Sequence, residues 1–399
     1  MNATIIKVTQ DARVIKTGFN PVKRMKTMLL TLLFVCAATA PAFAVGIQAG
    51  VPTNISIGTG TNSAPTLIGY GGRQWAVIGY NGTGVVSATS DMTLLWMSMT
   101  GIGSTPFNST QDISYDGSLM QTAMNNIPTT LSLSDKEVSI VDPVDLVGGA
   151  VAGSLSGMAG QDVVGALFWP LSVEEAGQVN LSVRAFGVAT DFSNRSWWLR
   201  SPGIYTNPVS AAMIFGDGEI SGVRSVTTPS FVRPAFRVKL ASVIFTSAPG
   251  AKSAATVGGA MIPAEATGAN TVLKFTFAVS SLTLGIITKT NRTGNTITFN
   301  YTGATAGKTL SAAVFGNNGT LKYYGKLADN IAASGSASVT VPDGFLVETD
   351  RMQIFVEEAN GDNYTDFASE YKELEVLPQA SPPTASPASG TAFAMQVAV

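Results

Sequence analysis

Short runs of β-forming residues, separated by turns that contain glycine, asparagine or aspartate, recur along most of this chain. Residues 67–70 (LIGY) and 74–80 (QWAVIGY) are two such runs near its beginning. Apolar side chains at helical spacing occur at 115–127, where Asp116 or Ser118 is placed to cap a helix. The pattern predicts a β-rich chain that also contains helices.

Residues 270–377 contain six of these runs at a spacing of roughly ten residues. The runs are Thr296–Tyr301, Leu310–Phe315, Leu321–Tyr324, Ser336–Val341, Met352–Glu357 and Lys372–Leu377. This spacing predicts an antiparallel β-sandwich of about 100 residues. The segments on either side are rich in small residues, so we expect a linker at 246–269 and a flexible Pro/Ser/Ala tail at 378–399.

The beginning of the chain has the pattern of an export signal. Three basic residues precede an apolar run at 28–38 (MLLTLLFVCAA), and Ala-Phe-Ala follows at 42–44. We therefore expect residues 1–44 to be a signal peptide, with Met25 as an alternative translation start. After its removal, residues 45–64 are expected to form a flexible leader, and the mature chain is not an integral membrane protein.

Histidine is absent from the sequence, and the single cysteine, Cys36, lies within the expected signal peptide. The usual ligands of zinc, copper, haem and iron–sulfur centres are therefore missing, as are the nucleophile–histidine pairs of many hydrolases. Large exported eukaryotic domains usually carry disulfides, so a cysteine-free exported chain is typical of bacteria. We expect a bacterial protein that is secreted or associated with the cell surface.

Charged residues make up only 13% of the chain, and the net charge is −2. No basic block follows the signal peptide, which argues against nucleic acid as a partner. Glu174 and Glu175 are neighbours that do not face each other on a helix, so we expect a solvated helix start rather than a catalytic pair. Oxygen ligands for Ca²⁺ occur at 142–145 and 217–219 but form no complete loop, so no metal site or cofactor is expected.

Three motifs occur in one order: WWLRSPG at 197–203, GDGEI at 216–220 and VRPAF at 232–236. They resemble a family of secreted bacterial domains that carry W-L-R-S-P-G, D-G and V-R-P-A motifs and have no assigned activity. The resemblance covers residues 65–245 and implies an α+β C-type-lectin-like fold. The later part of the chain, with YYGKL and TDFAS, is similar to a domain that often follows, which implies an all-β immunoglobulin-like sandwich at 270–377.

Most of the motif residues are expected to build the fold. Neighbouring side chains of a strand alternate between its faces, so one of the two adjacent tryptophans is expected in the core, and buried arginines need partners. The structural set is Trp197, Trp198, Arg200, Pro202, Gly203, Asp217, Gly218, Arg233 and Pro234. The Gly-Asp-Gly segment is expected to form the turn between strands at 211–215 and 219–223.

Ligand contacts are expected from the polar loops beside the motif, because binding residues concentrate on loops held by a rigid scaffold. The candidate residues are Tyr205, Thr206, Asn207, Arg224, Ser225 and Thr227. Aromatic, amide and hydroxyl side chains suit adaptable recognition, whereas the calcium-dependent sugar motifs of animal lectins are missing. We therefore expect an exported, non-enzymatic binding or adhesion protein for a glycan or protein ligand at the bacterial cell surface.

Two other functions stay open at this point. A structural component of a surface layer, extracellular matrix or appendage would use the sandwich as a spacer, and the apolar end of the tail (AFAMQVAV) would support self-assembly by strand addition. A carboxylate-based glycan hydrolase would need an acid–base pair at a defined separation. The sequence marks no such pair.

Overall fold

The computed structural model describes residues 45–97, 102–148, 158, 160–185, 195–207, 209–267 and 272–377. The expected signal peptide, the alternative start at Met25 and the tail at 378–399 lie outside these residues. None of the helices in the described part of the chain is long and apolar enough to span a bilayer.

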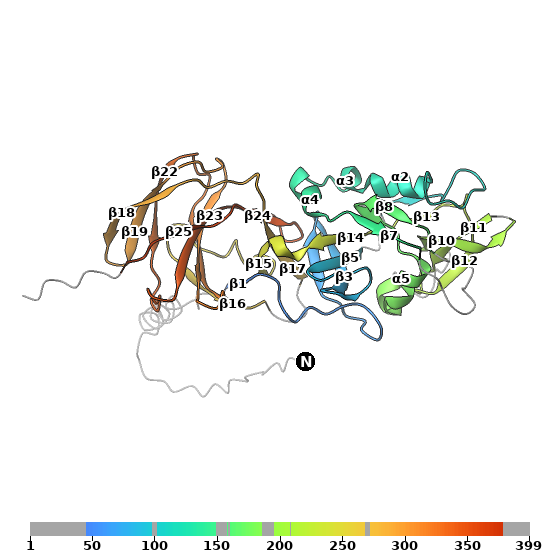
Figure 1. Cartoon of the computed structure of the whole chain (residues 1–399), viewed down its shortest axis with the longest axis horizontal. Helices are drawn as coiled ribbons and strands as arrows, with labels where there is room; N and C mark the ends of the chain where they lie inside the picture. The colour runs from blue at the N-terminus through green and yellow to red at the C-terminus, as the bar shows by residue number, and fades with distance from the viewer. Residues whose placement is uncertain are drawn as a thin grey trace, which may run out of the picture. The chain divides into compact units, whose positions relative to one another are not determined.

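The first part of the chain consists of short strands and short helices (Figure 1). Its strands are β1 (Val45–Ala49), β2 (Leu67–Tyr70), β3 (Arg73–Tyr80), β4 (Thr83–Gly84), β5 (Asp91–Trp96), β6 (Ser104–Thr105), β7 (Val144–Leu146), β8 (Val163–Ala166), β9 (Phe168–Trp169), β10 (Trp197–Thr206), β11 (Val209–Ile214), β12 (Ile220–Ser225), β13 (Ser230–Phe231), β14 (Ala235–Lys239) and β15 (Val243–Ser247). Its helices are α2 (Leu119–Asn125), α3 (Ile127–Thr130), α4 (Asp135–Ile140), α5 (Val173–Gln178), α6 (Leu181–Arg184) and the 3₁₀ turn η2 (Leu240–Ser242). The helix predicted at 115–127 is shorter than expected, and Ser118 caps it by accepting a hydrogen bond from the Gln121 N–H.

Most strands of this first part belong to two sheets. The strands β2, β3, β5, β14 and β9 pair in that order, and β12, β11, β10, β13 and β6 form the second sheet. In the core, the ring centroid of Trp75 lies 5.0 Å from that of Trp96 and 4.6 Å from that of Phe236. Aromatic side chains bury large areas, so this cluster contributes strongly to the stability of the first sheet.

The second part of the chain has only strands among its described elements. They are β16 (Ile262–Glu265), β17 (Val272–Ala278), β18 (Ile287–Thr293), β19 (Thr296–Tyr301), β20 (Thr309–Phe315), β21 (Leu321–Ala328), β22 (Gly335–Thr340), β23 (Arg351–Glu358), β24 (Asp366–Ala368) and β25 (Lys372–Leu374). All six runs predicted between residues 296 and 377 correspond to strands. Their positions could be predicted because alternating side chains and Gly- or Asn-containing turns mark them locally.

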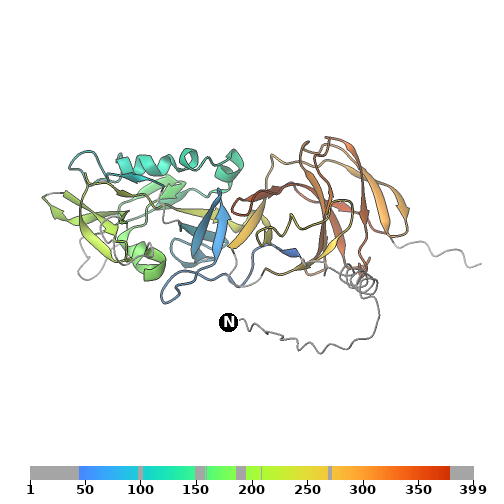
Figure 2. The same cartoon turned by 180° about the vertical axis from the view of Figure 1, so that it is seen from behind.

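Eight strands close into a barrel. Their order is β15, β1, β16, β21, β20, β23, β24 and β17, and β17 pairs back with β15. Figures 1 and 2 show the blue β1 beside β15 and β16, which come from a distant part of the sequence. The segments predicted as a flexible leader at 45–64 and a linker at 246–269 therefore each contribute strand residues to this barrel.

Strand β17 belongs to both the barrel and the first sheet. One of its edges pairs antiparallel with β15. Along the other edge, residues 272–274 pair with β2 and residues 276–278 pair with β24, both in parallel. A continuous hydrogen-bonded ladder thus joins the two parts.

Strands β20 and β23 separate two cores. Ala312 and Val314 point towards the three-stranded sheet β18-β19-β22, where they pack in one cluster with Phe299. Ala313, which lies between them on β20, and Phe355 on β23 belong to the cluster inside the barrel. This is the alternation expected of strands that are covered on both faces.

The predicted α+β C-type-lectin-like domain is wrong, and the all-β immunoglobulin-like sandwich predicted after it is not confirmed. The structure is mostly β, with 43% strand and 10% helix, and is built around the eight-stranded barrel. The described helices are only four to seven residues long, so they cannot form the helical layer of an α+β domain. Strands β17, β20, β21, β23 and β24 complete the barrel with β1, β15 and β16, so the domain predicted at 270–377 shares five of its strands with the barrel.

Candidate functional site

Strand β10, which carries the tryptophan motif, passes from the core to the surface. Its first five residues are buried and its last three are exposed. Both Trp197 and Trp198 are completely buried, whereas alternation placed only one of them in the core. Trp198 donates its Nε1–H to the Thr105 carbonyl at 2.8 Å, and Trp197 donates to the Arg184 carbonyl at 3.2 Å. Neighbouring side chains point to opposite faces of β10, but both faces are covered here, so neither ring reaches solvent.

Arg200 forms a buried, bidentate ion pair with Glu175. Nη1 and Nη2 each lie 2.5 Å from one oxygen of this carboxylate, and Nε donates to the Gln161 carbonyl at 3.0 Å. Glu175 also accepts a hydrogen bond from the Ser172 N–H in the capping box that begins α5. The prediction of a solvated helix start is therefore wrong for Glu175, which instead fastens α5 to β10.

Arg233 is held by main-chain carbonyl groups in the core. It donates to the carbonyls of Trp96 at 2.7 Å, Arg184 at 2.6 Å and Val183 at 2.7 Å. Its guanidinium lies 4.9 Å from the centre of the Trp197 ring, and burial lowers its pKa to about 9. Arg233 thereby ties the end of α6 to β5 and β10.

Gly203 is required where β10 leaves the core. A Cβ atom there would lie 2.2 Å from Ser210 Oγ and 2.4 Å from the Gly222 carbonyl oxygen, which is closer than any side chain permits. The preceding residue, Pro202, is half-buried at a register shift between β10 and β11. Gly203 therefore allows the close approach of β10 to its neighbours, and Pro202 marks the change of register, so both residues have structural roles.

The hairpin predicted across the Gly-Asp-Gly turn is confirmed by the pairing of β11 with β12. Asp217 accepts a hydrogen bond from the Glu219 N–H at 3.0 Å, and Gly218 has a φ of +93°, a conformation that favours glycine. Pro234 is buried, and its carbonyl accepts a hydrogen bond from the Trp96 N–H at 3.1 Å. These motif residues therefore all have contacts within the fold.

The six residues predicted to bind a ligand gather at one end of the second sheet. Strand β10 ends at Thr206, β11 begins at Val209 and β12 ends at Ser225, and antiparallel pairing brings these three ends together. We call this surface the tip and define it as residues 204–207 and 223–227. Figure 1 shows β10, β11 and β12 side by side.

The tip presents both apolar and polar side chains to solvent. Tyr205 and Ile204 are each 51% exposed, and Val223 is 46% exposed. Asn207 and Thr206 are exposed as well. Among the described residues, neither the Tyr205 hydroxyl nor the Asn207 amide has a hydrogen-bond partner, so both are free to meet a ligand.

The other three predicted residues lie on the β12 side of the tip. Thr227 is exposed, and its hydroxyl lies 3.1 Å from that of the half-buried Ser225. Arg224 is half-buried and donates to the Pro229 carbonyl at 3.2 Å. These contacts lie within the loop itself and leave the exposed Thr227 at its surface.

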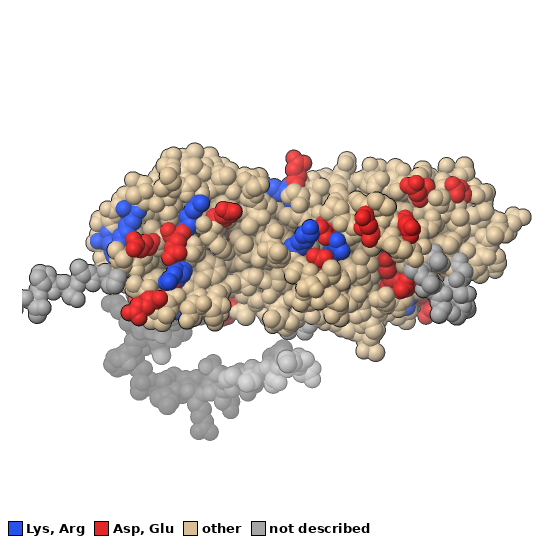
Figure 3. Space-filling model, in the orientation of Figure 1, with Lys and Arg blue, Asp and Glu red and all other residues tan. Residues whose placement is uncertain are grey.

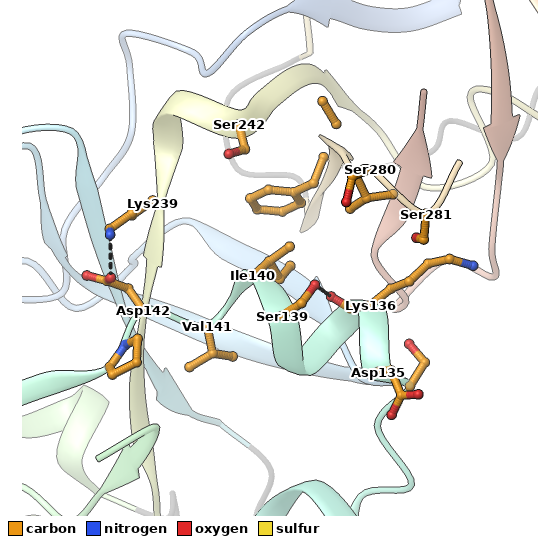
Figure 4. A pocket seen from close by; sticks show the side chains of 15 residues that line it. Asp135, Lys136, Ser139, Ile140, Val141, Asp142, Lys239, Ser242, Ser280 and Ser281 are labelled. Atoms are coloured by element: carbon orange, nitrogen blue, oxygen red, sulfur yellow. Dashed lines mark hydrogen bonds and ion pairs between the residues drawn. The ribbon is translucent and has the colours of Figure 1, made fainter. Parts of the chain in front are cut away.

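A groove of about 880 Å³ opens elsewhere on the protein (Figure 4). Helix α4 forms one wall, and the opposite wall carries the exposed side chains of Ser242, Ser280 and Ser281. At one end, Asp142 pairs with Lys239 at 2.9 Å and with Arg237 at 2.5 Å. The sequence gives no sign of this groove, because the residues that line it come from three distant segments and share no motif.

Metal ligands do not gather in the described residues, where no group of three or more carboxylates is close enough to hold an ion. Two of the carboxylates considered for Ca²⁺ have partners elsewhere in the fold. Asp142 is paired with arginine and lysine, and Asp145 accepts a hydrogen bond from the Gly165 N–H at 2.7 Å. These carboxylates thus serve local structure.

Residues 93–240 match a family described as a domain of unknown function (DUF6273). The matched range includes β10, the Arg200–Glu175 pair and the tip. Neither a curated protein nor a solved structure matches the chain.

Proposed function

We propose that this protein is an exported, non-enzymatic binding protein that recognises a glycan or protein ligand at the bacterial cell surface through the tip. The observation that carries the proposal is the course of β10, which is anchored in the core at one end and exposed at the other. A strand fixed in this way holds its exposed residues in place. Rigid presentation lowers the entropy lost on binding.

The chemistry of the tip supports recognition by contact rather than by charge. Tyr205 offers a flat aromatic surface, and Asn207 and Thr227 offer amide and hydroxyl groups for hydrogen bonds. Tyrosine, asparagine and serine are typical of adaptable binding surfaces, and exposed apolar groups rimmed by polar ones mark interaction sites. Both glycans and protein loops present matching groups.

The charge distribution agrees with this kind of ligand. On the face shown in Figure 3, basic and acidic side chains lie together at the left and in the middle, the groups at the right are mainly acidic, and wide uncharged areas separate them. A nucleic-acid ligand would call for a basic stripe. An uncharged or weakly charged ligand fits this face better.

The contacts of the carboxylates favour a binding role over hydrolysis. Glu175 is neutralised by Arg200, and Asp142 by Arg237 and Lys239. A glycan hydrolase needs one carboxyl group whose proton is available and a second one facing it across the bond. Carboxylates that are held by cations in the fold are poorly suited to either role.

The test is a glycan and host-protein array probed with the purified chain from residue 45, once with Ca²⁺ and once with a chelator. Three variants at the tip, Tyr205→Ala, Asn207→Ala and Arg224→Ala, should each weaken a specific signal at least several-fold. The matched control is the double variant Ser280→Ala and Ser281→Ala in the groove, which should bind like the unchanged protein.

Two results would argue against this proposal. Loss of binding in the groove variant alone would move the site from the tip to the groove. A blank array under both conditions would favour the structural alternative, a surface or matrix component, and size-exclusion chromatography would then test for self-assembly. A product in a glycan-turnover screen would instead favour the hydrolase.

A further inference from the structure

The interior of the barrel holds four charged side chains in contact with one another. Lys252, Lys274, Glu357 and Asp366 are each at most 4% exposed. Two positive and two negative charges balance formally, so the group is neutral as a whole. Buried ion pairs rarely add stability compared with apolar packing, so this cluster calls for an explanation other than stability of the barrel.

Lys252 lies between the two carboxylates. Its Nζ is 3.0 Å from Glu357 Oε2 and 3.5 Å from Asp366 Oδ2, and it donates to Thr276 Oγ1 at 2.7 Å. The Phe245 ring covers it at 5.5 Å. The amine is thus desolvated and held within reach of two carboxyl carbons.

The two oxygens of Asp366 have different surroundings. Oδ1 accepts a hydrogen bond from the Asn360 N–H at 2.7 Å and lies 3.0 Å from Lys274 Nζ. Oδ2, which faces Lys252, accepts no hydrogen bond from the described residues. One oxygen is therefore stabilised as an anion, and the other is left without a donor that would hold it.

Glu357 is stabilised as the second carboxylate. Its Oε1 accepts hydrogen bonds from the hydroxyl groups of Ser311, at 2.8 Å, and Tyr324, and its Oε2 contacts Lys252. It touches the amine more closely than Asp366 does. Glu357 is thus placed to accept a proton from Lys252 rather than to be attacked by it.

We propose that Lys252 and Asp366 react within the folded barrel to form an amide crosslink, with Glu357 as the proton carrier. Glu357 takes a proton from the Lys252 ammonium, and the neutral Nζ attacks Cγ of Asp366. The bond from Cγ to Oδ2 breaks as the bond from Nζ to Cγ forms. Two ammonium protons leave with Oδ2 as one water molecule, and Glu357 ends unchanged as a carboxylate.

The surroundings of Asp366 supply the electrostatic support that this step needs. The negative charge of the tetrahedral intermediate develops on Oδ1, where the Asn360 N–H and the Lys274 ammonium already point. The reacting groups are held in contact by the fold, which replaces a bimolecular encounter with a positioned one. No oxidant, metal or co-reactant is required.

Burial also favours the product. An ammonium and a carboxylate in the barrel carry a desolvation cost that a neutral amide does not. A cavity of about 90 Å³, lined by Lys252 and Lys274 among others, adjoins the cluster and can receive the released water. Each molecule needs to react only once, so the reaction can be slow. An energetically unfavourable proton transfer to Glu357 is therefore compatible with it.

The crosslink would close a loop over residues 253–365 and fasten the turn after β15 to β24. The only cysteine of the sequence is Cys36, which comes before the barrel, so no disulfide can do the same within the barrel. The inference concerns only the barrel. It stands independently of the ligand proposed for the tip.

The deciding experiment is the intact mass of the purified, unfolded wild-type chain. The crosslinked protein should weigh one water less than its sequence, and proteolysis should release a branched peptide that joins Lys252 to Asp366. A mass equal to that of the linear sequence in a folded preparation would overturn the proposal. A branched peptide joining Lys252 to Glu357 would overturn the assignment of Asp366.

Two variants and a matched control test the roles. Lys252→Arg removes the nucleophile and Glu357→Gln removes the proton carrier, and both should keep the full linear mass. Lys326→Arg changes a lysine that lines the same cavity but contacts neither carboxylate, so it should lose water as the wild type does. Loss of water in Glu357→Gln at the wild-type rate would refute its role.

Discussion

Replacing Glu175 by glutamine tests whether the buried ion pair holds the motif strand in place. Glutamine at this position can still complete the capping box of α5, so the change removes the charge and little else. Arg200 would then be buried opposite a neutral amide, with the Gln161 and Pro170 carbonyls as its remaining acceptors. Breaking a buried pair in this way costs about 3–5 kcal/mol.

The matched control is Glu358→Gln on the surface. Glu358 pairs with Lys136 at 2.8 Å and with Lys308 at 2.5 Å, but these side chains are 23–29% exposed. Pairs at the surface contribute only about 0–1 kcal/mol. The two variants thus make the same chemical change in a buried and in an accessible ion pair.

Equilibrium unfolding in guanidinium chloride, followed by tryptophan fluorescence, measures both variants. All five tryptophans lie between residues 75 and 198, so the signal reports on the part that contains Arg200. With a slope of about 5 kcal/mol/M, the midpoint of Glu175→Gln should fall by roughly 0.6–1 M. A shift no larger than that of Glu358→Gln would refute the reasoning, and Arg200→Met added to Glu175→Gln should recover part of the loss.

Three further predictions concern stability. Gly203→Ala should lower the denaturation midpoint because its Cβ would meet Ser210 and Gly222, whereas Gly177→Ala, where nothing lies within 4 Å, should leave it unchanged or raise it slightly. Ser134→Ala removes the N-cap of α4 and should cost about 1 kcal/mol in the same unfolding assay; an equal loss in Ser139→Ala would contradict this. Burial raises the pKa of five tyrosines, so their unfolded forms ionise first and stability should fall as the pH rises above about 10. These tyrosines are Tyr70, Tyr80, Tyr115, Tyr324 and Tyr371. Unfolding midpoints that stay constant between about pH 9 and 11 would show that these hydroxyls titrate normally in the folded state.

Features with a local signal could be predicted from the sequence. The strands between residues 296 and 377 are marked by alternation and turn residues, and the hairpin around Gly218 by its turn. The N-cap at Ser118 follows from the helical spacing behind it. The gathering of Tyr205 and Arg224 at one end of a sheet also follows, because their strands are joined through β11.

Features that depend on distant pairing could not be predicted. Strands β1 and β16 are short and contain small or polar residues, and their partners lie far along the chain, as in the pairing of Val45 with Ala264. Their composition therefore indicated a flexible leader at 45–64 and a linker at 246–269. Glu175 appeared solvated beside Glu174 because the sequence does not show that Arg200 covers it. The motif resemblance did not determine the fold, since its residues fix only local packing around β10.

The sharing of β17 between the two parts has a consequence for the order in which the protein folds. The first sheet lacks a neighbour for β2 until residues 272–274 are available, and β1 waits for β15 and β16. The early residues therefore cannot reach their final structure until residues 272–274 have been made. Such distant contacts slow folding, so a newly made chain stays open at β1 and β2 after most of its first part has been made.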